Sequence, residues 1–144
     1  MGIYTNEKYR IKRSAEYETQ MRFLIRDLKL FPDYASILTV SAVIGYNNKL
    51  FVPVTKSASD AVQIQFFNPR SRDIMDLIAY SYEKKQSVLS GDEKYSIFEA
   101  YANGGFPLLI NKLEADFDDP SKNDKYKILM NYFNLLLRNE FVLE

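Results

Sequence analysis

The sequence predicts a mainly α-helical fold: a compact single-domain helical bundle around a buried central helix at about residues 32–45. The first observation is length, because 144 residues fit one domain with its own core. The second is periodicity, because most segments repeat apolar residues at helical spacing. The third is the segment 32–45 itself, which carries no charge after Asp33 and has apolar residues on every side of a helical wheel. Such a helix has to lie inside the packing.

The composition limits the chemistry that the chain can perform. Histidine and cysteine are both absent, which removes the commonest general base, the commonest metal ligand, disulfides and thiolate sites. Lysine plus arginine balance aspartate plus glutamate at 19 each, so the chain is not an overall polycation. No apolar run is long enough to span a bilayer, and no signal-peptide pattern opens the chain. We therefore expect a cytoplasmic protein with no metal, no cofactor and no membrane contact.

Residues 1–14 carry an excess of positive charge and are expected to form a basic arm, with a mobile segment and a short helix as the two alternatives. The cations are Lys8, Arg10, Lys12 and Arg13. Two interpretations remain open, an arm that contacts phosphate groups and a frayed, soluble terminus. Residues 15–30 then predict a helix, and Arg22 and Arg26 lie on its polar face. These cations together are the candidate nucleic-acid contacts, although a charged helix face is also ordinary solvation.

The segment 32–45 has a rival interpretation as the first strand of a hairpin, because its second half is rich in β-branched residues. Pro32 and Asp33 suit the first turn of a helix, and Gly45 suits a left-handed helix end. These signals favour the helix, and the strand remains the alternative.

A small β-ribbon is expected after this segment. Residues 50–54 are typical of a short strand, although Pro53 restricts them to a sheet edge. Residues 62–67 alternate apolar and polar side chains. We expect 50–54 and 62–67 to pair with each other and to pack on helices, because an isolated two-stranded ribbon is only marginally stable.

Three helices are expected in the next part of the chain, the last two on either side of a glycine pair. Asn68 and Pro69 are typical of a helix start, and that helix ends near Gly91. A second helix leads to a motif of candidate partner-binding or structural residues: Tyr101, Asn103, Gly104 and Gly105. A third apolar stripe then runs from Phe106 to Phe117. Adjacent glycines indicate either a sharp bend or a very close approach of two backbones. We expect a tight corner between two helices, and a backbone concavity for an anion or a partner is the alternative.

The C-terminal part predicts an acidic loop at 116–124 and a helix at 125–138. The loop lacks the glycine and the final glutamate of a calcium-binding EF-hand. The helix carries an unbroken apolar stripe that we expect to pack against the central helix: Tyr126, Leu129, Met130, Phe133, Leu136 and Leu137.

No constellation of residues indicates catalysis. Phosphate-binding glycine loops and the zinc-protease motif are absent. Glu83 and Lys85 match half of a nuclease signature, but that signature needs a strand where this sequence predicts a helix. Glu99 has no identified partner for acid–base work. We therefore expect no catalytic residues and no enzyme activity.

Two motifs carry a family resemblance. The first is Gly45-Tyr46-Asn47-Asn48-Lys49 leading to Val52-Pro53, and the second is Phe98-Glu99-Ala100-Tyr101-Ala102-Asn103-Gly104-Gly105. With these motifs at this spacing, about residues 20–115 resemble the DNA phosphorothioation (Dnd) system-associated protein 4 family. Phe106 stands where leucine is expected, a departure that keeps the apolar character.

The resemblance implies an accessory of a bacterial DNA-modification and anti-phage restriction system, without established catalytic residues. It also favours the helical interpretation of 32–45. Two hypotheses for the function follow. In the first, the protein contacts double-stranded DNA, or DNA-bound protein subunits of that system, through its basic residues. In the second, it is a protein–protein adaptor or oligomeric scaffold without nucleic-acid contact.

Overall fold

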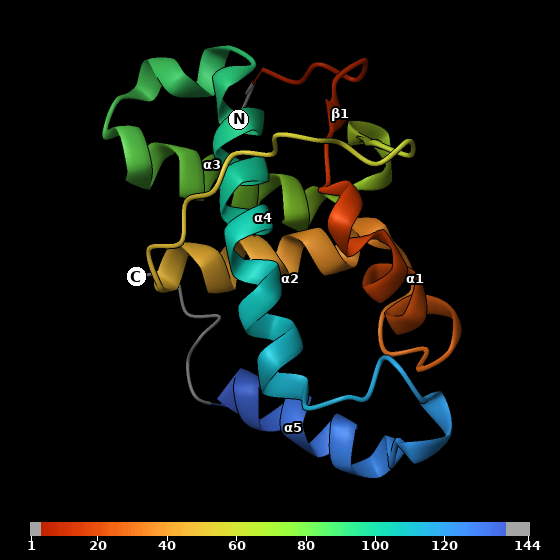
Figure 1. Cartoon of the computed structure of the whole chain (residues 1–144). Coiled ribbons are helices and arrows are strands. Elements are labelled where there is room, and N and C mark those ends of the chain that lie inside the picture. Colours follow the sequence, from red (N-terminus) through yellow and green to blue (C-terminus); the bar gives the residue numbers. More distant parts are fainter. Residues whose placement is uncertain (1–3, 138–144) are drawn as a thin grey trace.

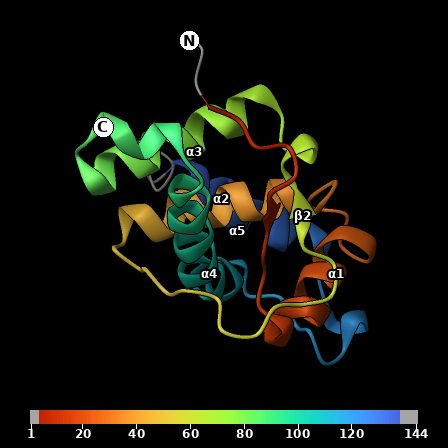
Figure 2. The ribbon, with the colours of Figure 1, turned by 90° about the horizontal axis from the view of Figure 1, so that it is seen from above.

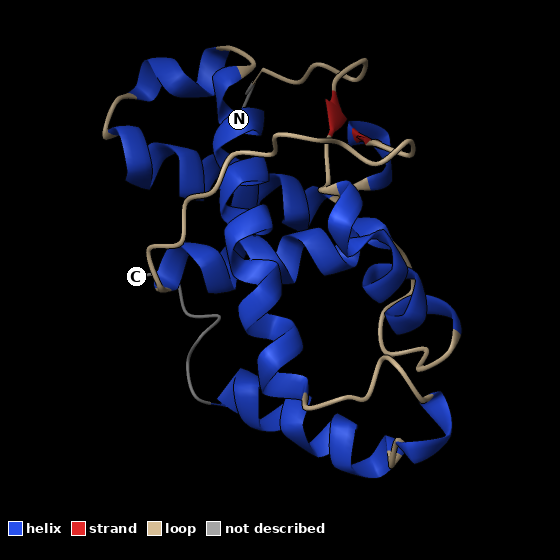
Figure 3. Ribbon diagram, in the orientation of Figure 1, coloured by secondary structure: helices blue, strands red, loops and turns tan. Residues whose placement is uncertain are grey.

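The computed structural model describes residues 4–137, and Figures 1 and 3 show that helices dominate it. Its α-helices are α1 (Glu18–Arg26), α2 (Tyr34–Asn47), α3 (Pro69–Glu83), α4 (Glu93–Leu113) and α5 (Lys125–Leu137). One short 3₁₀ turn precedes α1 at Ala15–Tyr17, and others lie between the later helices at Ile64–Phe66, Gln86–Ser90 and Pro120–Lys122. The prediction of a mainly helical fold is confirmed. No helix in this part of the chain is both long and apolar enough to cross a membrane.

Helix α2 is the buried central element that the sequence predicts, and the strand alternative is wrong. The Asp33 carboxylate accepts a hydrogen bond from the Ser36 amide at 2.9 Å and caps the first turn. From Ala35 to Gly45, all residues are buried except Ser36 and Val40. The helix continues past Gly45 to Asn47, so the expected stop at this glycine is wrong.

Helix α4 crosses α2 in Figures 1 and 2, and glycines let the two backbones meet. A Cβ on Gly105 would overlap the carbonyl oxygen of Ser41 and lie 2.6 Å from the amide nitrogen of Gly45. A Cβ on Gly45 would overlap the carbonyl oxygen of Tyr101. The expected corner at Gly104 and Gly105 is wrong, because α4 is one helix through both residues. The glycines provide a close backbone approach instead.

The strand expected within 62–67 forms, but its partner is the N-terminal segment. β1 (Arg10–Ile11) and β2 (Val62–Gln63) pair antiparallel. The expected pairing of 50–54 with 62–67 is wrong, because residues 50–54 form no strand. The Val52 amide instead donates to the carbonyl oxygen of Ala100 in α4 at 3.0 Å. A carbonyl group of α4 therefore accepts the backbone hydrogen bond that a carbonyl group of a partner strand would have accepted.

Residues 4–14 lie on the body of the protein instead of extending from it as an arm. The Asn6 amide donates a hydrogen bond to the Tyr95 hydroxyl at 2.9 Å. Ile11 is fully buried in the core. This attachment determines which of the N-terminal cations face the solvent.

Helix α5 turns the apolar stripe expected in the core toward the solvent. Ile128 and Leu135 are buried, and the Tyr132 ring packs on Phe31 with 5.3 Å between ring centroids. The expected stripe is 37–82% exposed and is called the outer stripe below: Tyr126, Leu129, Met130, Phe133, Leu136 and Leu137. The expectation was wrong because α5 is apolar on two faces, and α4 contacts the other one. The expected helix end at 138 lies outside the described residues.

We predict that Gly105→Ala destabilises the protein by about 3 kcal/mol, because the added methyl group has to displace backbone atoms of α2 instead of a flexible side chain. Gly91→Ala is the matched control, since a Cβ at Gly91 meets no atom within 4 Å. It should change the free energy of unfolding by less than about 0.5 kcal/mol. Urea denaturation measures both variants, and equal effects would contradict the close contact.

Candidate nucleic-acid interface

Lys8, Arg10 and Lys12 form the basic row, an exposed set of cations along the N-terminal segment. Arg10 and Lys12 are exposed, whereas Ile11 and Arg13 between and after them are buried. Residues two apart on an extended segment share one face at a separation of about 6.6–6.8 Å. Lys8 is exposed in the turn just before, which the hydrogen bond from the Tyr9 amide to the Asn6 carbonyl closes.

Arg13, a predicted phosphate contact, is buried and is not presented to a ligand. Its guanidinium forms an ion pair with Glu18 and lies 3.7 Å above the centre of the Tyr34 ring. Its Nε also donates to the carbonyl oxygen of Asp60 at 3.1 Å. Arg13 therefore anchors the segment that carries the basic row. Only 1% of Arg13 is exposed, which does not fit the expectation that it contacts nucleic acid.

Glu18 is the acid around which the arginines of this region gather. Burial acts to raise the pKa of Glu18, but the hydrogen bond and charge of Arg13, with hydrogen bonds from Tyr34 and Arg22, outweigh it and hold the pKa below the ordinary value. Arg22 lies 3.0 Å from the Glu18 carboxylate, and 48% of its side chain is exposed. Arg22 thus keeps an open side despite its partner. Arg26, one turn further along α1, is also exposed.

Two side chains of α4 hold the N-terminal segment in place. The Glu99 carboxylate accepts a hydrogen bond from the Lys12 amide at 2.7 Å. The Asn103 side chain accepts from the Ser14 hydroxyl at 2.5 Å and donates to the Val52 carbonyl oxygen at 2.9 Å. Sequence reasoning considered Glu99 only as a catalytic acid, although its position one turn before Asn103 on the same helix face was a signal for this role.

The rest of the Tyr101–Gly105 motif also serves packing. The Tyr101 ring makes edge contacts with Tyr46 and Phe51, at 5.4 and 5.1 Å between centroids. Burial raises the pKa of the Tyr101 hydroxyl. Gly104 faces the backbone of Leu50, where a Cβ would overlap the carbonyl oxygen. The motif therefore positions the segments around α4, and these contacts leave no open concavity at the glycines.

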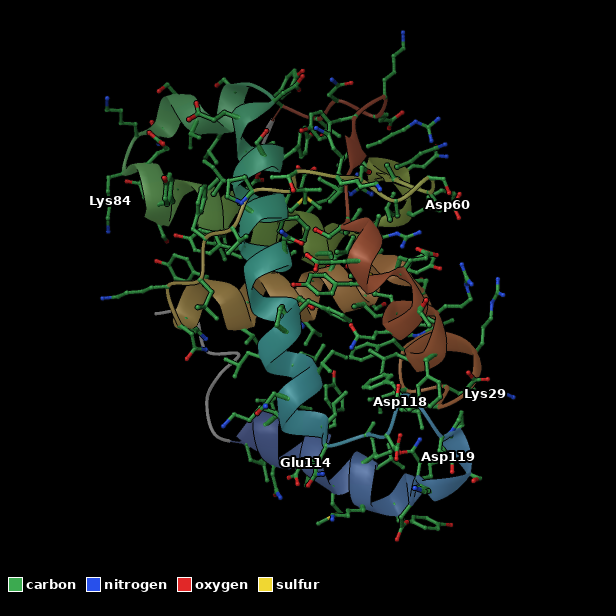
Figure 4. All side chains as sticks on the ribbon, viewed as in Figure 1. Lys29, Asp60, Lys84, Glu114, Asp118 and Asp119 are labelled. Carbon is green, nitrogen blue, oxygen red and sulfur yellow. The ribbon has the colours of Figure 1, made fainter. Side chains whose placement is uncertain are left out.

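The structure brings five of the six candidate contacts to the surface: Lys8, Arg10, Lys12, Arg22 and Arg26. Arg10 is part of β1, and Arg22 and Arg26 are part of α1. Figure 1 shows that these two elements lie on the same side of α4. Figure 4 labels Lys29 and Asp60 on that side as well. The surface is thus rich in cations but also holds an exposed acid beside β2.

A polar pocket of about 410 Å³ lies between the N-terminal segment and the first turns of α3 and α4. Lys94 is buried there and forms an ion pair with Asp76 at 2.9 Å. Its ammonium group also donates to the carbonyl oxygen of Tyr4. Sequence reasoning missed this pair, because no local pattern marks Lys94 as buried. Within residues 4–137, no group of three or more acidic, histidine or cysteine side chains is placed to hold a metal ion.

Burial raises the pKa of Glu99 above its ordinary value of 4.5, and the hydrogen bond from the Lys12 amide opposes that shift without cancelling it. A carboxyl group with a raised folded-state pKa destabilises the fold progressively as the pH rises from the unfolded pKa through the folded one. The stability cost of ionised Glu99 is therefore absent in acid and grows as the pH rises above 4.5 through the raised pKa of the folded state.

We predict that Glu99→Gln, which keeps an acceptor for the Lys12 amide, is at least as stable as the wild type at pH 7. Its advantage should shrink as the pH falls toward 4.5. Glu99→Ala leaves the amide unpaired and should lose about 1–3 kcal/mol. Urea denaturation across this pH range tests both. A Glu99→Gln protein less stable than the wild type at every pH would contradict the assignment.

No curated protein and no solved structure matches this chain. The model of one family does match, over residues 10–141. This range runs from β1 through α5 and extends beyond the 20–115 that the sequence motifs cover. The chain belongs to the DNA sulphur modification system-associated protein 4 family, which confirms the resemblance seen in its motifs.

Proposed function

We propose that this protein is a non-enzymatic accessory that contacts the phosphate backbone of DNA, or of DNA held by partner proteins, within a DNA sulphur modification system. The basic row makes the main contacts, and Arg22 and Arg26 extend them along α1. The observation that carries the proposal is the outward-facing basic row held on a fixed backbone. Family membership supplies the association with DNA sulphur modification.

Three contacts hold the basic row in a fixed position on the protein, in contrast to a disordered arm. The Lys12 amide is bound by Glu99, β1 pairs with β2, and Arg13 is buried beside Glu18. Cations on an ordered backbone lose less conformational entropy when they bind than cations on a disordered arm. Phosphate contacts of this kind fix orientation and carry no sequence information. The proposed role is therefore to position the protein on DNA.

In this proposal the protein acts in the bacterial cytoplasm, in an anti-phage restriction setting, and performs no chemistry of its own. The non-enzymatic part rests on a sequence with no histidine and no cysteine. It rests also on Glu99, whose carboxylate serves as the acceptor for a backbone amide. Metal-dependent DNA cleavage by the purified protein, lost in Glu83→Gln or Glu99→Gln, would overturn it.

A second candidate function is a protein–protein adaptor or oligomeric scaffold without nucleic-acid contact. Exposed apolar side chains favour it. The outer stripe of α5 is one such set, and Phe51, stacked on Tyr82 with 4.9 Å between ring centroids, is another. Apolar surface of this extent is typical of interaction sites.

We predict that the wild-type protein binds duplex DNA at low salt and that Lys8→Ala/Arg10→Ala/Lys12→Ala weakens binding. Each lost phosphate contact should reduce the slope of log K against log salt by about 0.9, or about 2.7 for the three. Fluorescence anisotropy across a salt series measures both quantities.

The matched control is Lys85→Ala/Lys122→Ala/Lys127→Ala, which removes the same charge from exposed positions away from the basic row. It should change the slope of log K against log salt by less than about 0.9, the contribution of one phosphate contact. Absence of wild-type binding, or an equal loss in both triple variants, would remove the first function. Co-purification of system subunits that survives nuclease treatment and is unchanged in the basic-row variant would then favour the adaptor.

A further inference from the structure

Helix α5 has two apolar faces, and the described chain covers only one of them. The inner face packs on the protein through Ile128, Tyr132 and Leu135. The side-chain amide of Asn131 also donates to the Leu113 carbonyl oxygen at the end of α4, at 2.9 Å. Figure 1 shows α5 at the lower edge of the molecule, with α4 on its upper side. The outer stripe faces away from these contacts. An exposed contiguous apolar face of this kind typically marks an interaction site.

The outer stripe repeats every seven residues. Aromatic rings occur at Tyr126 and Phe133, and leucines occur at Leu129 and Leu136. Met130 and Leu137 form a third pair with the same spacing. Apolar residues three and four apart in a seven-residue repeat form the seam through which one helix packs along another. The pattern therefore favours a helix as the occupant.

The exposed area suits a second copy of this chain. Aromatic side chains offer about 150–250 Å² each. Taking roughly 200 Å² for each of the six side chains, exposures of 37–82% leave roughly 650 Å² open on the stripe. This is at or above the largest patch of a typical monomer, about 300–600 Å². Two copies would bury about 1,300 Å² together, which reaches the range of specific interfaces.

The charges beside the stripe favour an antiparallel arrangement. Lys125 and Lys127 are exposed at the N-terminal end of α5. In a parallel pair these cations would meet their own counterparts, and like charges repel. In an antiparallel pair they lie at opposite ends of the interface, and the helix dipoles also oppose each other.

We propose that the outer stripe of α5 packs antiparallel against the same stripe of a second copy, forming a two-fold symmetric homodimer. Met130 of each copy then lies beside Phe133 of the other, near the symmetry axis. Because α5 and β1 lie at opposite ends of the molecule in Figure 1, each copy keeps its N-terminal strand open. The dimer does not depend on DNA binding, and it would present two basic rows on one particle.

Sedimentation velocity on the full chain tests the dimer. The wild type should show a concentration-dependent dimer at up to about 100 μM, since an interface at the lower end of the specific range can have micromolar affinity. Met130→Glu/Phe133→Glu should be monomeric while keeping the wild-type helical circular dichroism. Phe66→Glu/Leu77→Glu is the control, because it places two acids on exposed apolar positions in other elements. It should still dimerise.

Cross-linking tests the orientation, and the natural absence of cysteine makes single substitutions clean. Phe133→Cys should be linked to itself by a short bismaleimide. Tyr126→Cys should not, since its two copies would be separated by about 16 Å along the helices. Linkage at Tyr126→Cys overturns the antiparallel arrangement.

Several results would overturn the dimer itself. One is a wild type that stays monomeric at every concentration. Another is a dimer that survives Met130→Glu/Phe133→Glu or is equally lost in the control. A protein that dimerises only after removal of residues 138–144 would assign the stripe to the chain's own C-terminal segment and would also overturn the proposal.

Discussion

The contact between the backbones of α2 and α4 fixes the rest of the structure. Gly45 and Gly105 bring the two helices closer than side chains would permit. These glycines therefore set the place along α2 at which the backbone of α4 can approach it. From that position Glu99 and Asn103 reach the N-terminal segment and the backbone at Val52. The basic row is thus oriented by a contact in which none of its members takes part.

Much of the fold is predictable because it follows from local pattern. The segment 32–45, which carries no charge after Asp33, specifies a buried helix, and the Asp33 cap supports it. The sequence predicts a corner at the glycine pair instead of a helix crossing, because it cannot show whether another backbone approaches Gly105. The ribbon partner was misassigned because β1 is only two residues long and carries no strand pattern of its own. Each error concerns a contact between segments distant in the chain.

The candidate site divides in the same way. Charge alone identifies Lys8, Arg10 and Lys12 as candidates, but it cannot separate them from Arg13. That distinction depends on Glu18 and on the Tyr34 ring, which only the folded chain brings together. Likewise the hydrophobic pattern of α5 shows which residues are apolar, and not which of the two apolar faces meets α4. Burial of long cations and the choice between equivalent faces are tertiary properties.

The hydrogen bonds that Glu99 and Asn103 of α4 accept from the N-terminal segment join positions 87 and 89 residues apart. Such non-local contacts form late, because a long loop has to close first. During synthesis on the ribosome, the cationic segment emerges well before the helix that secures it. Until then the early lysines and arginines lack their final support, and any premature termination before Glu99 yields a product in which that surface is never assembled.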